Sequence, residues 1–511
     1  MALNNSGPIS LGGATVGQSI NLELGQAATA NTSLNATNVR TLLQVPSGTI
    51  SLSNAYGKSN STAFIVSLGL QNAGATGVTT VPIRSYGWMA SPSGVTAWKM
   101  GGYTYGGFMS ADGTTFTSVN YDTSGARNAF FAPTQNKYTT ASVFPLVSSV
   151  NNRFFLLSST NNYNPPITTM LGTSEGGQGV CPFAYSLDSS GNISWLTNAN
   201  ESKYGSYFII GKFTLSGTNV KILQLTNYNA AIPYAAVKRL LQRTDGTYLA
   251  AWGASNAVNY RVINSALTSN TSSQTISCSL GGPVIGMDLD SSNNLYIYSR
   301  FGQVVKINTS GTVVDNYTYS AIGTGWASSF GQQGSFGISI YNDILYIATN
   351  GVENNASSAT GYYLNIIAIS CSSMAALWNK QFFFNTNEIR PMGTYAEAFA
   401  PGQANGIQAT SAGLYVAFTV GTGVSGEVFC MNLPLTVGIS NQTTNIAFKA
   451  GGSITMTVTS PTNTRSIIGS TATGSLTSYP TGGTPSQAST ANWASANYSP
   501  GIGGTKTTVP V

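Results

Sequence analysis

The sequence contains no histidine and few charged residues of either sign. Asp, Glu, Lys and Arg make up 7% of its 511 residues, compared with about 25% in a typical soluble protein. Without histidine, no Ser-His-Asp or Cys-His nucleophile arrangement and no histidine-ligated metal site can form. A glycosidase would need paired carboxylates, and the 15 acidic residues lie mostly in turn phrases such as SADGTT at 110–115. These absences predict a chain that is not an enzyme and that holds no cofactor.

Clustered basic residues and long apolar runs are also missing. Lys238 and Arg239, with Arg243 nearby, form the densest basic group, which argues against nucleic-acid binding. No stretch approaches the roughly 20 apolar residues of a membrane span. The first residues, MALNNSGPISL, lack the charged and apolar regions of a secretory signal peptide. The four cysteines lie far apart, which is typical of buried apolar side chains rather than of a disulfide or zinc framework.

What the chain does contain is Gly, Ser, Thr, Asn and aromatic residues, a composition that favours β-structure. Residues 6–58 read as a separate small unit. SINLELG at 19–25 alternates apolar and polar residues and predicts a strand. Residues 39–43, VRTLL, predict a short helix that ends before Pro46. GTISLSN at 48–54 predicts a second strand.

This unit resembles an N-terminal module of tailed-bacteriophage virion proteins, which include tail fibre and baseplate proteins. The phrases GPISLGGATVGQSINLELGQ and SLNATNVRTLLQVPSGTISLSNAYGKS carry the resemblance, which covers about the first tenth of the chain. The resemblance implies that the module docks the protein onto a phage particle, with Ile50, Leu52, Tyr56 and Lys58 as docking residues. It also implies other virion proteins as partners, several copies on the particle, and a protein that is made in the host bacterial cytoplasm and resides in the virion tail.

Four phrases in the long remainder repeat one pattern of a turn, an aromatic residue, a short apolar run and a glycine. They are GTYLAAWG at 246–253, NLYIYSRFG at 294–302, ILYIATNG at 344–351 and GLYVAFTVG at 413–421. Phe155 and Tyr207 stand in looser relatives of the pattern. Several of the spacings fall near the 40 to 50 residues of a propeller blade. We therefore predict an all-β protein with a β-propeller-like body of six to eight blades, seven being favoured, and a sandwich array or a fibre of β-repeats as the competing architecture.

The expected domain division follows from these patterns. Residues 1–60 form the docking module, 61–450 the propeller-like body, and 451–511 a pair of strands followed by a Ser/Thr/Gly-rich arm. This arm is too polar to form a core of its own. It is expected to be either a flexible tail or an extended arm ordered against a neighbouring subunit. If Tyr248, Tyr296, Tyr346 and Tyr415 are equivalent, each begins a strand in successive sheets around one axis.

Two segments are candidate binding sites. GGYTYGGFM at 101–109 places Tyr103, Tyr105 and Phe108 among glycines, and aromatic rings beside amides and hydroxyls suit sugar faces; Tyr163 is a weaker case. Packing of these rings between blades is the alternative. A second segment has oxygen donors at alternate positions, as a calcium loop does: Asp288, Asp290, Ser292 and Asn294. The Gly at the sixth position and the closing Glu at the twelfth position of such a loop are missing, which favours a β-turn between blade strands.

Together these observations predict a bacteriophage virion structural protein. It would be a tail fibre or baseplate-peripheral component that binds the particle through its first module and presents its body for attachment to a host-surface glycan. A polysaccharide-degrading tail protein and a capsid decoration protein without a host ligand are the alternatives.

Overall fold

A computed structural model describes the fold. The residues that it describes are 3–4, 7–15, 17–24, 26–43, 48–55, 63–70, 88–91, 94–100, 105–120, 129–131, 134–135, 143–148, 153–158, 166–169, 181–187, 193–201, 205–213, 219–225, 238–253, 257–268, 274–278, 280, 284–299, 302–320, 335–352, 362–385, 389–391, 406–420, 427–435, 439–449, 451–468, 474–476, 490–492 and 504–509.

The N-terminal module is a small helical unit rather than a β-unit. Its elements are α1 (Ile20–Glu23), α2 (Thr37–Leu43) and the 3-10 helix η1 (Leu52–Ala55). The helix at 39–43 is confirmed, but the two predicted strands are wrong. Ser19 caps α1 by accepting a hydrogen bond from the Leu22 N–H at 3.3 Å, and such a cap starts a helix in a segment too short for its alternation to decide.

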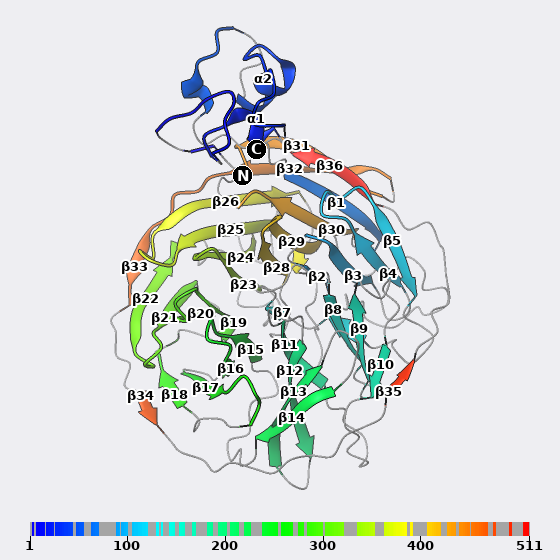
Figure 1. The fold of residues 1–511 in the computed structure, drawn as a ribbon, viewed down its shortest axis with the longest axis vertical. Coiled ribbons are helices and arrows are strands. Elements are labelled where there is room, and N and C mark those ends of the chain that lie inside the picture. Colours follow the sequence, from blue (N-terminus) through cyan, green and yellow to red (C-terminus); the bar gives the residue numbers. More distant parts are fainter. Residues whose placement is uncertain are drawn as a thin grey trace.

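The body consists of β-sheets arranged in a ring, so the predicted all-β, propeller-like fold is confirmed (Figure 1). The described strands form seven sheets, and strands of successive sheets contact one another all the way round. We number the sheets as blades 1 to 7 in ring order. Each described pairing between strands of a blade is antiparallel, apart from β7 against β11.

Blades 1 to 3 come first in the chain. Blade 1 holds β2 (Trp88–Ala90), β3 (Thr96–Met100), β4 (Tyr105–Met109) and β5 (Phe116–Asn120). Blade 2 holds β6 (Ala129–Phe131), β8 (Val143–Ser148), β9 (Arg153–Ser158) and β10 (Pro166–Thr169). Blade 3 holds β7 (Thr134–Gln135), β11 (Cys181–Leu187), β12 (Ile193–Glu201), β13 (Gly205–Phe213) and β14 (Asn219–Leu225).

Blades 4 to 7 complete the ring. Blade 4 holds β15 (Lys238–Gln242), β16 (Tyr248–Gly253), β17 (Ala257–Ile263) and β18 (Gln274–Ser277). Blade 5 holds β19 (Val284–Leu289), β20 (Leu295–Ser299), β21 (Gln303–Ile307) and β22 (Val313–Tyr319). Blade 6 holds β23 (Ser335–Tyr341), β24 (Ile344–Val352), β25 (Tyr362–Ser370) and β26 (Ala376–Phe384). Blade 7 holds β27 (Ile389–Pro391), β28 (Ile407–Thr410), β29 (Gly413–Val420), β30 (Glu427–Leu433) and, from the start of the body, β1 (Ala63–Leu70).

The C-terminal segment forms a belt around the outside of the ring. After β31 (Gln442–Ala447), the belt strands are β32 (Ser453–Thr459), β33 (Arg465–Ile467), β34 (Gly474–Leu476), β35 (Thr490–Asn492) and β36 (Thr505–Val509). They pair in turn with the outer strands of blades 6, 5, 4, 2 and 7. The belt strands therefore lie on blades of their own chain, which differs from both arrangements expected for a C-terminal arm.

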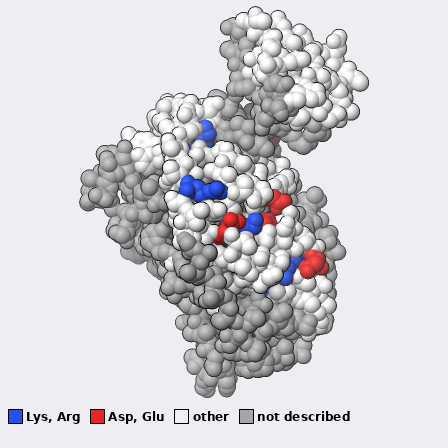
Figure 2. All heavy atoms as spheres, turned by 90° about the vertical axis from the view of Figure 1, so that its left-hand side faces the viewer, with Lys and Arg blue, Asp and Glu red and all other residues white. Residues whose placement is uncertain are grey.

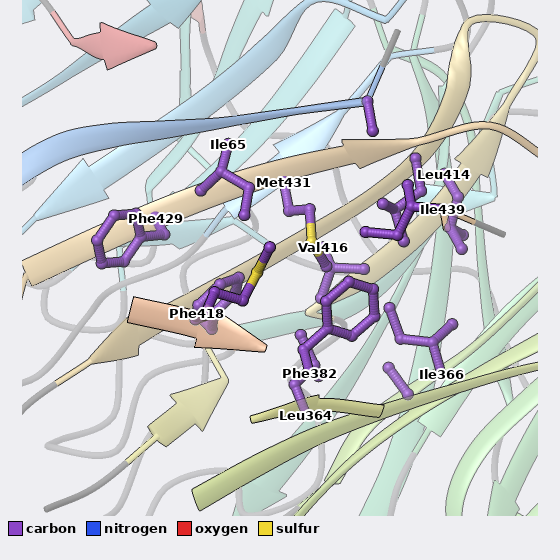
Figure 3. Packing of buried hydrophobic residues seen from close by; sticks show 14 of the residues in the cluster. Ile65, Leu364, Ile366, Phe382, Leu414, Val416, Phe418, Phe429, Met431 and Ile439 are labelled. Atoms are coloured by element: carbon purple, nitrogen blue, oxygen red, sulfur yellow. The ribbon is translucent and has the colours of Figure 1, made fainter. Parts of the chain in front are cut away.

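The core lies between the blades. Among the described residues, the largest cluster of buried apolar side chains fills the space between blades 6 and 7, with Phe382, Phe418 and Met431 among its members (Figure 3). The belt contributes to it through Met456 and Val509. The described cysteines at 278, 371 and 430 are buried thiols, as their spacing predicted. None of the described helices is long and apolar enough to cross a membrane.

Candidate functional site

The predicted aromatic binding loop is only partly within the described residues. Tyr103 and Tyr163 lie outside them. Tyr105 begins β4, where it pairs with Asn120. Phe108 lies in the same strand, but its side chain is only 2% exposed, so its ring packs inside the body and offers no face to a sugar. For this residue the packing alternative holds. Glycan binding by the remaining tyrosines stays a prediction.

The segment that was considered as a calcium loop forms the turn between β19 and β20. Asp290 Oδ1 accepts hydrogen bonds from the backbone N–H groups of Ser292 at 3.0 Å and of Asn294 at 2.8 Å. Asp288 Oδ1 accepts one from the Leu289 N–H at 2.8 Å. These carboxylates therefore bind the backbone, as aspartates in turns do. Among the described residues no three Cys, Asp or Glu side chains are grouped so that they could hold a metal ion.

The inner strands carry a set of polar side chains that sequence reasoning missed. In three consecutive interfaces, a buried side chain of one blade accepts a hydrogen bond from the backbone of the next blade's inner strand. The pairs are Ile340 N–H to Asp288 Oδ2 (2.6 Å), Ala409 N–H to Ser339 Oγ (3.0 Å) and Ala90 N–H to Gln408 Oε1 (3.0 Å). We call this set the hub. Because its oxygens are committed to the backbone, the hub joins blades 5, 6, 7 and 1 rather than offering a reactive group.

Blade 4 ends this series because its equivalent residue is Leu241, which has no side-chain acceptor. Leu241 pairs with Leu249 in the next strand of its blade, as the three hub residues pair with Tyr296, Tyr346 and Tyr415. The same inner strand carries Arg239 two residues earlier. Burial lowers the pKa of Arg239 to about 10, while the negative charge of Asp288 acts in the opposite direction. A buried guanidinium is tolerated when a negative group lies in its surroundings. Asp288 thus offsets part of the cost of burying Arg239.

Three of the repeated tyrosines form a second set of links between blades, which we call the latch tyrosines: Tyr296, Tyr346 and Tyr415. All three are fully buried. Each hydroxyl donates to a backbone carbonyl of the following blade or its flanking turn, the pairs being Tyr296 to Cys371 O (2.9 Å), Tyr346 to Leu435 O (3.0 Å) and Tyr415 to Ala111 O (3.2 Å). Burial raises the pKa of each of these phenols.

The fourth repeated tyrosine is out of register with the other three. Tyr248 begins β16, the second strand of its blade, as predicted. Its neighbour Leu249 packs into the core cluster shared with blade 5, and successive side chains of a strand point to opposite faces. Tyr248 therefore faces blade 3, whereas Tyr296 packs with the blade 6 side chains Ile338 and Leu345. Leu249 occupies the latch position in blade 4.

The predicted docking residues lie at the end of the N-terminal module. Ile50 packs against the module's core, and Leu52 in η1 is 39% exposed. Tyr56 and Lys58 lie outside the described residues. Arg40 donates to the Gly48 carbonyl at 3.0 Å and so ties α2 to the chain before η1. Leu52 is thus the predicted docking residue that the structure leaves available to a partner.

The outer surface carries few charges. Figure 2 shows the side of the ring where β22 and β26 lie, with a few basic and acidic groups, some of them next to one another, among white described residues. The described part of the module in the same view carries neither colour.

Comparisons with known proteins agree with the fold. No protein-family model and no curated protein sequence matches the chain. Among solved structures, it is similar to virginiamycin B lyase from Staphylococcus aureus at 12% identity and a TM-score of 0.41, covering 72% of this chain and 99% of the lyase. It is also similar to a luciferin-regenerating enzyme at 10% identity and a TM-score of 0.34, covering 74% and 98%. The WD40 propeller domain of Doa1 matches at 11% identity and a TM-score of 0.36, covering 73% and 97%.

These comparisons contradict the prediction that the chain is not an enzyme, because the similar structures include a lyase and a luciferin-regenerating enzyme. The lack of histidine and the scarcity of acids exclude particular catalytic groups, not enzymatic activity as a class. At these identities and TM-scores no reaction or catalytic residue is carried over to this chain. Its fold is that of a β-propeller.

Proposed function

We propose that this chain is a structural component of a tailed-bacteriophage particle. The N-terminal module docks on the tail, and the propeller is held outward as a tail fibre or baseplate-peripheral element. The observation that carries the proposal is the resemblance of residues 6–58 to a virion-protein module. Its partners are other virion proteins and, on the outward side, a glycan of the host surface.

The structure of the module is consistent with a docking unit. Its core is made of its own residues: Leu3, Ile20, Val39, Leu42, Leu43 and Ala55 are buried together. The module lies outside the ring, beyond β31 and β36 (Figure 1). A unit with its own core, joined to the body through residues 56–62, keeps its binding surface whatever the body contacts. Leu52 supplies an exposed apolar side chain on that unit.

The body is consistent with a part that remains intact outside a cell. A ring of sheets leaves few strand edges exposed, and the belt covers the outer edges of five blades. Covered edges protect a β-protein against pairing with other chains. The predicted host-side ligand is a glycan, and it rests on the sequence GGYTYGGFM at 101–109.

Incorporation into particles tests the proposal. A chain without residues 1–58 should fold, because the body's sheets contain no strand from the module, and it should be absent from purified particles. Leu52→Asp should reduce incorporation of the full chain, since a charge would enter a desolvated contact. Val314→Asp is the matched control: Val314 is 48% exposed on the ring's rim, and this variant should incorporate normally. Normal incorporation of the truncated chain would overturn the docking role.

A further inference from the structure

Strand β1 joins the N-terminal module to the ring and lies inside the sheet of blade 7. It follows residues 56–62 directly in the sequence and lies between β30 and β36. Phe64 pairs with Asn432 on one side and with Thr508 on the other. Because β1 comes from the start of the body and β30 from the end, this pairing closes the ring. Any pull on the module therefore reaches the ring through β1.

Both faces of β1 are buried. Ala63 and Ile65 belong to the core cluster shared with blade 6, and Phe64 and Val66 to the cluster shared with blade 1. One edge of β1 pairs with β30, and its other, outer edge pairs with β36. Figure 3 shows Ile65 of β1 beside Met431 and Phe429 of β30, where β1 and β30 close the ring.

Strand β36 is fixed by side chains as well as by its backbone. Val509 is 1% exposed within the blade 6–7 cluster. The Lys506 ammonium donates to the Asp112 carbonyl at 2.6 Å and lies 4.7 Å from the centre of the Phe64 ring. Gly504 passes so close to blade 1 that an added Cβ would lie 2.6 Å from the Phe116 ring. These contacts tie β36 to blades 7 and 1 at once.

The far end of β1 is held by a buried hydrogen-bonded group. Glu427, at the start of β30, is 2% exposed and accepts a hydrogen bond from the Ser67 hydroxyl. Its Oε1 also accepts from the backbone N–H of Lys449 at 3.0 Å, and the same N–H lies 2.8 Å from Ser67 Oγ. Ser67 lies in β1 and Lys449 follows β31, so Glu427 links β1, β30 and the segment before the belt.

We propose that β36 is a lock that prevents β1 from leaving blade 7, so that load applied to the N-terminal module is borne without opening the ring. The geometry requires that β36 be displaced before β1 can peel outward, since β36 covers the only edge of β1 that faces away from the ring. The source of the load rests on the proposed function. The lock itself rests only on the pairings and contacts of β1 and β36.

Hydrogen exchange in the full-length chain tests the lock. Val509→Asp puts a carboxylate into the apolar cluster and should release β36, so that the β1 amides exchange at least about tenfold faster. Thr508→Asp is the matched control, because Thr508 is the adjacent residue of the same strand and its side chain is exposed. It should leave β1 unchanged. Equal β1 exchange in wild type and Val509→Asp would overturn the lock.

Force spectroscopy adds a second readout with the same variants. The chain is held by its N-terminus and by a Cys introduced at Thr309, an exposed turn residue of blade 5. Opening of blade 7 should need a lower force in Val509→Asp, and in a chain that ends at residue 503, than in wild type or Thr508→Asp. Equal forces in all four would contradict the proposal. Neither measurement involves a particle, so failure of the lock and failure of docking are separate results.

Discussion

Removing the hydroxyl of a single latch tyrosine should weaken the contact between two blades. Tyr415 of blade 7 is fully buried, and its hydroxyl donates to the Ala111 carbonyl of blade 1 at 3.2 Å. Gly94 of blade 1 lies against the same oxygen, because an added Cβ there would be 2.5 Å from it. Tyr415→Phe keeps the ring and its packing and removes only the donor.

The expected cost follows from the partner that is left behind. A neutral hydrogen bond contributes about 0.5–1.5 kcal/mol net, and a buried acceptor left unpaired costs about 1–3 kcal/mol. Ala111 lies in a turn that is partly exposed, so water can take over part of the bond. We therefore expect Tyr415→Phe to lower the free energy of unfolding by about 1 kcal/mol.

Tyr248 provides the matched control. It is equally buried, but among the described residues its hydroxyl has no hydrogen-bond partner. Tyr248→Phe should therefore be neutral or slightly stabilising, since it removes a buried polar atom that gains nothing. Urea denaturation followed by tyrosine and tryptophan fluorescence compares the two midpoints at equal slope. Equal costs for the two variants would refute the latch reasoning.

Three further predictions concern the same interfaces. Burial raises the pKa of the latch phenols, so above pH about 10 the unfolded chain ionises them while the folded chain keeps them neutral. The free energy of unfolding should therefore be constant below that pH and fall as the pH rises above it. Urea denaturation at several pH values, with phenol ionisation followed by absorbance at 295 nm, measures this. Gly94→Ala should cost about 1–3 kcal/mol more than Gly451→Ala, the usual penalty for overpacking. Both glycines have positive φ (84° and 94°), but an added Cβ would clash at Gly94 and would meet nothing within 4 Å at Gly451. Equal melting temperatures of the two variants would contradict this. Glu427→Ala should lower the free energy of unfolding in urea by about 1–3 kcal/mol, because it leaves the Ser67 hydroxyl without its acceptor. An unchanged urea midpoint would contradict a stabilising role of the Glu427–Ser67 hydrogen bond.

The propeller was predictable because its signal repeats. A turn, an aromatic residue and an apolar run recur in blades 4 to 7, and the tyrosines at 296, 346 and 415 do occupy one structural position. The failure at Tyr248 has a simple cause. Its phrase GTYLAAWG carries the aromatic residue one position earlier relative to the turn, and a shift of one residue places a side chain on the opposite face of a strand.

The strand β32 was among the two predicted at the start of the C-terminal segment, but the rest of the belt and the ring closure could not be read from the sequence. Belt strands such as GSL at 474–476 and TAN at 490–492 are three residues long and pair with blades through their backbones, so they have no side-chain periodicity to detect. The apolar run AFIVSLGL predicts a strand at β1, but it does not indicate which strand, hundreds of residues away in the sequence, β1 pairs with. The hub was missed for a related reason, since single Ser, Asp and Gln residues serve it without a shared motif.

A cryo-EM map of a phage particle that carries this protein would show where the protein sits. We expect density for the helical N-terminal module against the tail, with Leu52 in the contact and the ring of seven described sheets projecting away from it. Particles that lack the protein, or a map in which the ring contacts the tail and the module faces outward, would contradict docking through the module.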